Sequence, residues 1–190
     1  VPALLALAGR LGEDFAVAPE LAVLTLHRLA AHAAPGRQQA QVQRVVSHVA
    51  EAVGRPDCLA AKPWAQLVWA LARLSDADRF AAVATPEALQ HRLPSLAPQN
   101  VVNVMWAMAV VRSEDSAAAL AFSRRAGSNT DGLAPRELAA AAWALAHLLR
   151  AGPAHAMSEE QRDALRGFAD EALRRDFCGF EPQSIANLFW

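Results

Sequence analysis

A tryptophan recurs four times at the same place in a short apolar pattern, and this recurrence constrains the fold more than any other feature of the chain. Each of the last three copies has a proline eight residues before the tryptophan. The copies are AKPWAQLVWALA (61–72), PQNVVNVMWAMA (98–109), PRELAAAAWALA (135–146) and PQSIANLFW (182–190), so that Trp69, Trp106, Trp143 and Trp190 are 37, 37 and 47 residues apart. Similarity at such a period is typical of stacked supersecondary units rather than of one globular core.

Each unit is predicted to be a pair of helices. The chain is rich in alanine and leucine and contains no tyrosine, a composition that favours helices. In the third unit, Pro98 is expected to begin a helix that runs to about Arg112. The residues 113–115 are expected to cap a second helix that runs to about Arg125. The predicted fold class is all-α: a right-handed α–α superhelical solenoid of about four to five helix-hairpin repeats.

The helix pairs divide the chain into predicted repeats. The first, 19–60, is a degenerate repeat with His27 in the tryptophan place, and the next three are 61–97, 98–134 and 135–181. Residues 1–18 are predicted as the second helix of an incomplete preceding repeat, and 182–190 as the start of a truncated one. We therefore expect the chain to be part of a larger protein.

Two repeats carry local irregularities. The repeat 135–181 has an insertion, 150–157, before a capping-box pattern at residues 158–161 that is expected to begin its second helix. In the repeat 61–97, Thr85-Pro86 is expected to interrupt the second helix, because proline cannot donate the backbone hydrogen bond.

A helical wheel of the first helix of each repeat predicts its buried face. With the tryptophan at the origin and about 100° per residue, one apolar arc collects the positions five, four and one before it, the tryptophan, and the positions two and three after it. In the repeat 98–134 these are Val101, Val102, Met105, Trp106, Met108 and Ala109. The tryptophans are therefore predicted to be core residues, and truncating one is expected to destabilise the fold by about 3–5 kcal/mol.

The opposite arc holds the positions seven, six and three before the tryptophan and one and four after it. The residue just after the tryptophan is Ala70, Ala107 or Ala144, predicted to form a shallow exposed floor. Amide and basic side chains on this arc are the candidate RNA-binding residues: Lys62, Gln66, Arg73, Gln99, Asn100, Asn103, Arg136, His147, Gln183 and Asn187. Such a surface can recognise one base per repeat through side-chain edges and hold phosphates with basic groups. For any single residue, solvation or a hydrogen bond between repeats is at least as good an interpretation.

The repeated segments resemble a known family. Residues 98–109 and 182–190 are similar to the repeat signature of octotricopeptide-repeat proteins, in which proline-glutamine precedes leucine-alanine-asparagine and then tryptophan-alanine-leucine-alanine. The repeats of FAST-kinase-like and RAP-domain proteins are similar. The resemblance covers roughly residues 15–190 and is weakest at 19–30. The chain departs from the signature in two repeats. Glu137 and Ala140 replace the usual polar pair in the repeat 135–181, and Leu21 and Leu24 replace it in the repeat 19–60.

The resemblance implies an α-solenoid that binds organellar RNA, single-stranded or looped, and governs its maturation, stability or translation. Some members of the family are structural parts of algal mitochondrial ribosomes. It thus implies an RNA-binding protein within a larger ribonucleoprotein such as a mitochondrial ribosome, with RNA, including ribosomal RNA, and other proteins of the assembly as partners. The mitochondrion is the expected location, and the chloroplast stroma is the alternative.

The charge balance leaves a second class of function open. The net charge is −1, whereas RNA binders are commonly basic on the binding face. Either the arginines are concentrated on one side, or the chain contacts protein more than RNA, as a structural or protein-binding solenoid without base-specific contacts. A chloroplast RNA maturation or translation factor is a further alternative.

The sequence gives no support for catalysis. No HExxH, paired CxxC, GxGxxG or P-loop motif occurs in it. We therefore expect a protein that is not an enzyme, with no catalytic residue, metal site or cofactor. No uninterrupted apolar run is long enough to cross a bilayer, and we expect no membrane span.

Overall fold

A computed structural model describes residues 19–32, 39–53, 59–151 and 157–189, and every regular element within them is helical. The helix predicted within 1–18, most of the insertion 150–157, and Trp190 lie outside the described residues. The chain divides into two compact units, the first ending at Ala84 and the second beginning at Thr85.

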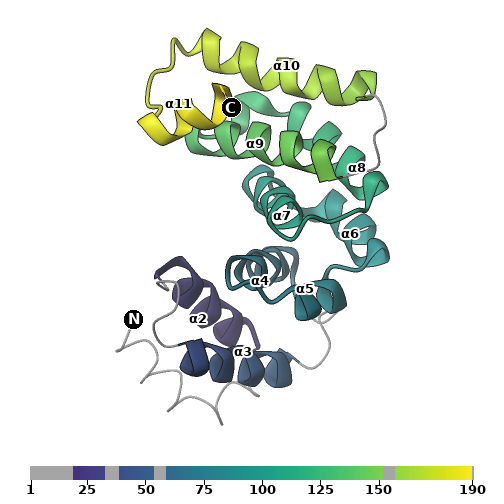
Figure 1. The fold of residues 1–190 in the computed structure, drawn as a ribbon, viewed down its shortest axis with the longest axis vertical. Coiled ribbons are helices and arrows are strands. Elements are labelled where there is room, and N and C mark those ends of the chain that lie inside the picture. Colours follow the sequence, from purple (N-terminus) through teal and green to yellow (C-terminus); the bar gives the residue numbers. More distant parts are fainter. Residues whose placement is uncertain (1–18, 33–38, 54–58, 152–156, 190) are drawn as a thin grey trace. The chain divides into compact units, whose positions relative to one another are not determined.

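The first unit contains two helix pairs. α2 (Pro19–His32) and α3 (Gln39–Val53) form one pair, and α4 (Ala61–Arg73) with the short α5 (Ala77–Val83) forms the other. α2 packs against both α3 and α4, and α4 packs against α5 (Figure 1). The first helices of two successive pairs, α2 and α4, therefore lie side by side.

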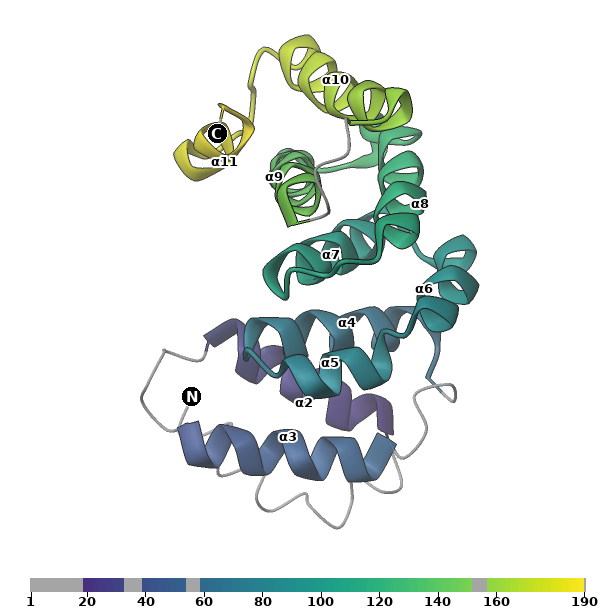
Figure 2. The same ribbon diagram turned by 45° about the vertical axis from the view of Figure 1, so that its right-hand side comes forward.

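The second unit has two layers of helices. It contains α6 (Pro86–Arg92), α7 (Pro98–Val110), α8 (Ser116–Gly127), α9 (Pro135–Ala151), α10 (Glu159–Arg174) and α11 (Pro182–Phe189), with the 3₁₀ turns η3 (Leu93–Ser95) and η4 (Thr130–Gly132). α7, α9 and α11 form one layer, and α6, α8 and α10 form the other (Figure 2). The contacts between successive helices are compatible with a helical solenoid. None of the helices in the described stretches combines the length and the apolar character that crossing a membrane requires.

Capping side chains set where several helices begin. Asp115 caps α8 by accepting a hydrogen bond from the Ala118 amide (2.9 Å). Thr85 caps α6 in the same way, which confirms the predicted interruption of the second helix at Thr85-Pro86. The capping box is also confirmed: Ser158 Oγ accepts from the Gln161 amide (3.2 Å), and Gln161 Oε1 accepts from the Ser158 amide (3.0 Å).

α4 and α7 end in the same way, with a left-handed residue six positions after the tryptophan. Ser75 (φ 59°) and Arg112 (φ 56°) adopt the left-handed conformation that usually favours glycine. The next amide in each case donates back to the final turn, from Asp76 to the Leu71 carbonyl (3.0 Å) and from Ser113 to the Met108 carbonyl (2.9 Å). α7 therefore ends at Val110, two residues before its predicted end.

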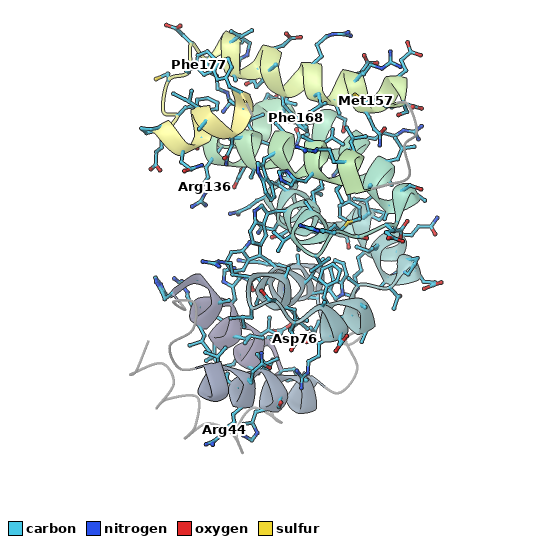
Figure 3. The ribbon with its side chains drawn as sticks, viewed as in Figure 1. Arg44, Asp76, Arg136, Met157, Phe168 and Phe177 are labelled. Atoms are coloured by element: carbon cyan, nitrogen blue, oxygen red, sulfur yellow. The ribbon has the colours of Figure 1, made fainter. Side chains whose placement is uncertain are left out.

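Large buried side chains fill the core of each unit. In the first, Trp64 is 1% exposed, and its indole N–H donates to the Val83 carbonyl (3.3 Å), which attaches α4 to the end of α5. In the second, Phe122 of α8 and Phe168 of α10 are completely buried, and Figure 3 shows Phe168 on the inner side of α10. α8 and α10 approach closely at Gly127, where an added Cβ would lie 3.0 Å from the Cβ of Ala164.

An ion network joins the end of α10 to the loop before α9. The buried carboxylate of Glu171 accepts two hydrogen bonds from Arg174 (2.8 and 2.6 Å) and one from Arg175 (2.7 Å). Arg175 also donates to the carbonyl oxygens of Thr130 (3.2 Å), Asp131 (3.0 Å) and Leu133 (2.7 Å). The hydrogen bonds from Arg174, and next those from Arg175, lower the pKa of Glu171 to about 2.

Candidate nucleic-acid interface

On α4, α7 and α9, the side chains that reach solvent beyond the first turn fall largely on one narrow stripe, which α11 shares in sequence. We define the stripe as the positions seven and three before the tryptophan, the tryptophan itself, and the position four after it. These residues repeat at helical spacing, so they share one side of the helix. The stripe comprises Lys62, Gln66, Trp69 and Arg73 on α4; Gln99, Asn103, Trp106 and Val110 on α7; Arg136, Ala140, Trp143 and His147 on α9; and Gln183 and Asn187 on α11.

The surroundings of α9 explain why the stripe is narrow. α9 packs against α7 and α11 in its own layer, and against α8 and α10 in the other layer. Leu138, Ala141, Ala144 and Leu145 are completely buried among these neighbours. Only the side that faces away from the second layer reaches solvent, and Figure 3 shows Arg136 extending outward from the start of α9.

Three of the repeat tryptophans lie on the stripe and not in the core. Trp69, Trp106 and Trp143 are each partly exposed, so the prediction that they are core residues is wrong. Among the described tryptophans, Trp64 is the one that fills the core, at the position five before Trp69 that the helical wheel assigned to the buried arc. The register of the helices was predicted correctly, but the predicted buried arc wrongly included the tryptophan.

The predicted alanine floor is wrong for the same reason. Ala70, Ala107 and Ala144 are completely buried. The wheel assumed a single buried face, whereas α9 packs against α7 and α11 as well as against α8 and α10. Small side chains at these positions are consistent with close packing of helices, whose axes are typically about 8–10 Å apart.

Most of the predicted site residues do reach solvent. Lys62, Arg73, Gln99, Arg136 and Gln183 are exposed, and Gln66, Asn103, His147 and Asn187 are partly exposed. Asn100 is buried, with 9% of its surface exposed, so the expectation that it lies on the open surface is wrong. Its position, six before the tryptophan, is also buried at Ser184 on α11.

Local hydrogen bonds and ring contacts order part of the stripe. The His147 ring lies over that of Trp143, with centroids 3.8 Å apart and planes at 31°. His147 Nδ1 lies 2.9 Å from the Trp143 carbonyl oxygen and must donate to it, because a carbonyl only accepts. On α11, Gln183 Nε2 donates to Asn187 Oδ1 (3.0 Å), which aligns the two amides.

The near-zero net charge conceals an uneven distribution. On α4, α7, α9 and α11 the one carboxylate is that of Glu137, and it accepts a hydrogen bond from the Ala134 amide at the helix start (2.8 Å). The stripes of these helices carry Lys62, Arg73 and Arg136, and Arg150 continues the same side of α9 beyond His147. Of the second helices, α10 carries five acidic residues and three arginines, whereas α8 carries two arginines and no acidic residue. Arg150 was not among the predicted residues, although its spacing of three from His147 could have indicated it.

His27 takes the tryptophan place on α2, where the stripe positions are Glu20, Leu24, His27 and Ala31. Its centroid lies 4.8 Å from that of Trp69, with the planes at 50°. Burial lowers the pKa of His27, and the charge of Arg28 lowers it further. The buried Nδ1 makes no hydrogen bond.

We expect the first unit to lose stability as the pH falls from about 7 to about 5. The unfolded chain binds a proton at the ordinary histidine pKa of about 6.5, whereas folded His27 binds it only at a lower pH. The stability contribution is thus complete above the unfolded pKa and is lost below it. His27→Phe is expected to flatten this part of the profile, measured by urea unfolding at a series of pH values. His32→Phe, exposed on the same helix, is the control, and an unchanged profile in His27→Phe would contradict the prediction.

Comparisons of the chain with protein-family models, with curated proteins and with solved structures found no match. The octotricopeptide resemblance therefore rests on the motifs in 98–109 and 182–190 and stays a prediction.

Proposed function

We propose that this chain is a non-catalytic RNA-binding helical repeat whose first helices hold single-stranded or looped RNA along their exposed stripes. The observation that carries the proposal is the composition of the stripe. On α4, α7, α9 and α11, each described stripe position holds an amide, a basic group, an aromatic ring or a small apolar residue, and none holds a carboxylate. A surface of this kind accommodates a polyanion better than α10, which carries five acidic residues.

The side chains divide by role. Lys62, Arg73 and Arg136 are exposed cations suited to phosphate oxygens, which set position and supply affinity without regard to sequence. Gln66 and Asn103 are partly buried amides with both donor and acceptor atoms, suited to the edges of unpaired bases. Ala140 and Val110 carry no polar group, so we expect the repeats to differ in how strongly they recognise RNA.

The cellular setting is part of the proposal. The similarity of residues 98–109 and 182–190 to octotricopeptide repeats favours a right-handed α–α solenoid that works in an organelle, the mitochondrion before the chloroplast. The limited excess of basic groups favours RNA held within a larger ribonucleoprotein, such as a mitochondrial ribosome, over independent binding. In such an assembly, other contacts supplement the affinity of the stripe.

The first test removes stripe cations. We expect the double variant Lys62→Ala/Arg73→Ala to bind a labelled single-stranded RNA more weakly than the wild type, whatever the RNA sequence. The logarithmic salt dependence of the affinity is expected to become shallower by about 0.7 for each phosphate that the variant no longer neutralises. Fluorescence anisotropy titrations at several salt concentrations measure both quantities.

The matched control is Arg44→Ala/Arg166→Ala. This variant loses the same charge, from exposed residues of α3 and α10 outside the stripe; Figure 3 shows Arg44 on α3. It is expected to retain the affinity and salt slope of the wild type. Equal loss in both double variants would indicate a general effect of net charge and would contradict a site on the stripe.

A protein-binding scaffold is the second candidate, favoured by exposed apolar side chains near the end of the chain. Leu173 of α10 is 62% exposed and Phe189 of α11 is 77% exposed. Co-sedimentation of the native protein with ribosomal particles distinguishes the two functions. Association that persists in Lys62→Ala/Arg73→Ala but is lost in Leu173→Ser/Phe189→Ser would favour the scaffold.

A further inference from the structure

We propose that the aromatic ring at the centre of each stripe is a base-stacking surface, so that unpaired RNA bases stack on the rings while the neighbouring amides contact the base edges. This inference rests on the proposed function, and it identifies the bases as the part of the RNA that contacts the rings. It assigns to the tryptophans a binding role in place of the packing role predicted from the sequence.

The identity of the central residue is the first argument. Every described occupant of this position is a planar ring: His27 on α2, Trp69 on α4, Trp106 on α7 and Trp143 on α9. All four are partly exposed, so none is used only to fill a core. An aliphatic residue would be sufficient for packing alone. Leu67 and Val104, two positions before the tryptophan, are such residues, and both are buried. A partly exposed indole, with an apolar face and a polar N–H, is typical of binding interfaces.

The neighbours of the rings are the second argument. On α4 an amide, a ring and a cation follow one another in Gln66, Trp69 and Arg73, about one helical turn of 5.4 Å apart. On α7, Asn103 precedes Trp106 at the same spacing. Proteins that hold single strands combine aromatic platforms for the bases with cations for the backbone. The stripe brings both groups together on one side of one helix.

The arrangement on α9 shows that the position accepts a stacked partner. The ring centroids of Trp143 and His147 lie 3.8 Å apart, with the planes tilted by 31°. The hydrogen bond from His147 Nδ1 to the Trp143 carbonyl fixes the orientation of the imidazole. A second aromatic ring can therefore lie against the indole at this position.

The test compares variants that keep an aromatic ring at this position with variants that keep only an aliphatic side chain able to pack there. Trp106→Leu and Trp143→Leu retain apolar bulk without a π-face, whereas Trp106→Phe and Trp143→Phe retain a ring. Binding of the full chain to labelled oligoadenylate, and to an abasic oligomer of the same length, is measured by fluorescence anisotropy. We expect each leucine variant to bind oligoadenylate about 5- to 150-fold more weakly, and each phenylalanine variant to lose much less. The abasic oligomer is expected to bind weakly to the wild type and equally to all variants.

The control is Trp64→Phe, which alters a buried tryptophan and is expected to leave oligoadenylate binding unchanged. Circular dichroism melting verifies that each variant is folded at the titration temperature. Leucine variants that bind oligoadenylate like the wild type, or that lose oligoadenylate and abasic binding in equal proportion, would overturn the inference but not the proposed function. A wild-type chain that binds neither probe would overturn both.

Discussion

Replacing Trp64 by alanine is expected to lower the free energy of unfolding of the first unit by about 3–5 kcal/mol, whereas Trp69→Ala is expected to have a clearly smaller effect. Trp64 is 1% exposed, and its indole N–H holds the Val83 carbonyl at the end of α5. The substitution would therefore leave a large cavity and an unpaired carbonyl oxygen. Urea unfolding followed by circular dichroism measures both variants under the same conditions.

The comparison with Trp69 makes the prediction specific. Trp69 is partly exposed, so its truncation removes less buried surface. What it loses includes the ring contact with His27, and such aromatic pairs contribute about 0.5–1.5 kcal/mol. Trp64→Phe serves as the conservative control and is expected to retain most of the stability. If Trp69→Ala were as destabilising as Trp64→Ala, the distinction between core and stripe tryptophans would be incorrect.

The sequence was sufficient to predict the helices and much of their register. The motif spacing located the first helices, and the capping pattern at residues 158–161 and the break at Thr85-Pro86 located second helices, because these signals depend on local hydrogen bonds. The wheel also placed Val101, Val102, Met105 and Met108 correctly in the buried arc, since each is 0% or 1% exposed. Properties determined within a few residues of one helix were therefore accessible from the sequence.

Properties determined by neighbouring helices could not be predicted from the sequence. The burial of Ala144 and Asn100 depends on which helices cover the flanks of α9 and α7, and alanine is compatible with either a covered or an open surface. The left-handed Arg112 was missed because a glycine is the usual signal for such a helix end. The hydrogen bonds of Arg175 with residues more than forty positions earlier have no local signature at all.

Arg175→Ala is expected to destabilise the second unit by disrupting its ion network. The Arg175 guanidinium connects the Glu171 carboxylate with three carbonyl oxygens of the loop between α8 and α9, and only 18% of the side chain is exposed. We expect a loss of at least about 1.5–3 kcal/mol in the free energy of unfolding, the contribution of one hydrogen bond to a charged group. Arg175→Lys is expected to recover only part of it, since an ammonium cannot reproduce the planar fork. Urea unfolding gives the values, and Arg174→Ala is the matched control, because that side chain is 66% exposed and bonds to Glu171 without reaching the loop.

Acidification tests the same network independently. Because the folded pKa of Glu171, about 2, lies below its ordinary value of 4.5, the stabilisation by this carboxylate is complete above about pH 4.5 and is lost as the pH falls toward 2. Glu171→Gln cannot titrate and is expected to be less stable than the wild type at neutral pH but to approach it near pH 2. In Arg175→Ala the hydrogen bonds from Arg174 persist, so an intermediate dependence on pH is expected. A constant difference between Glu171→Gln and the wild type across this range would show that the carboxylate stabilises the unit by packing and not by its charge.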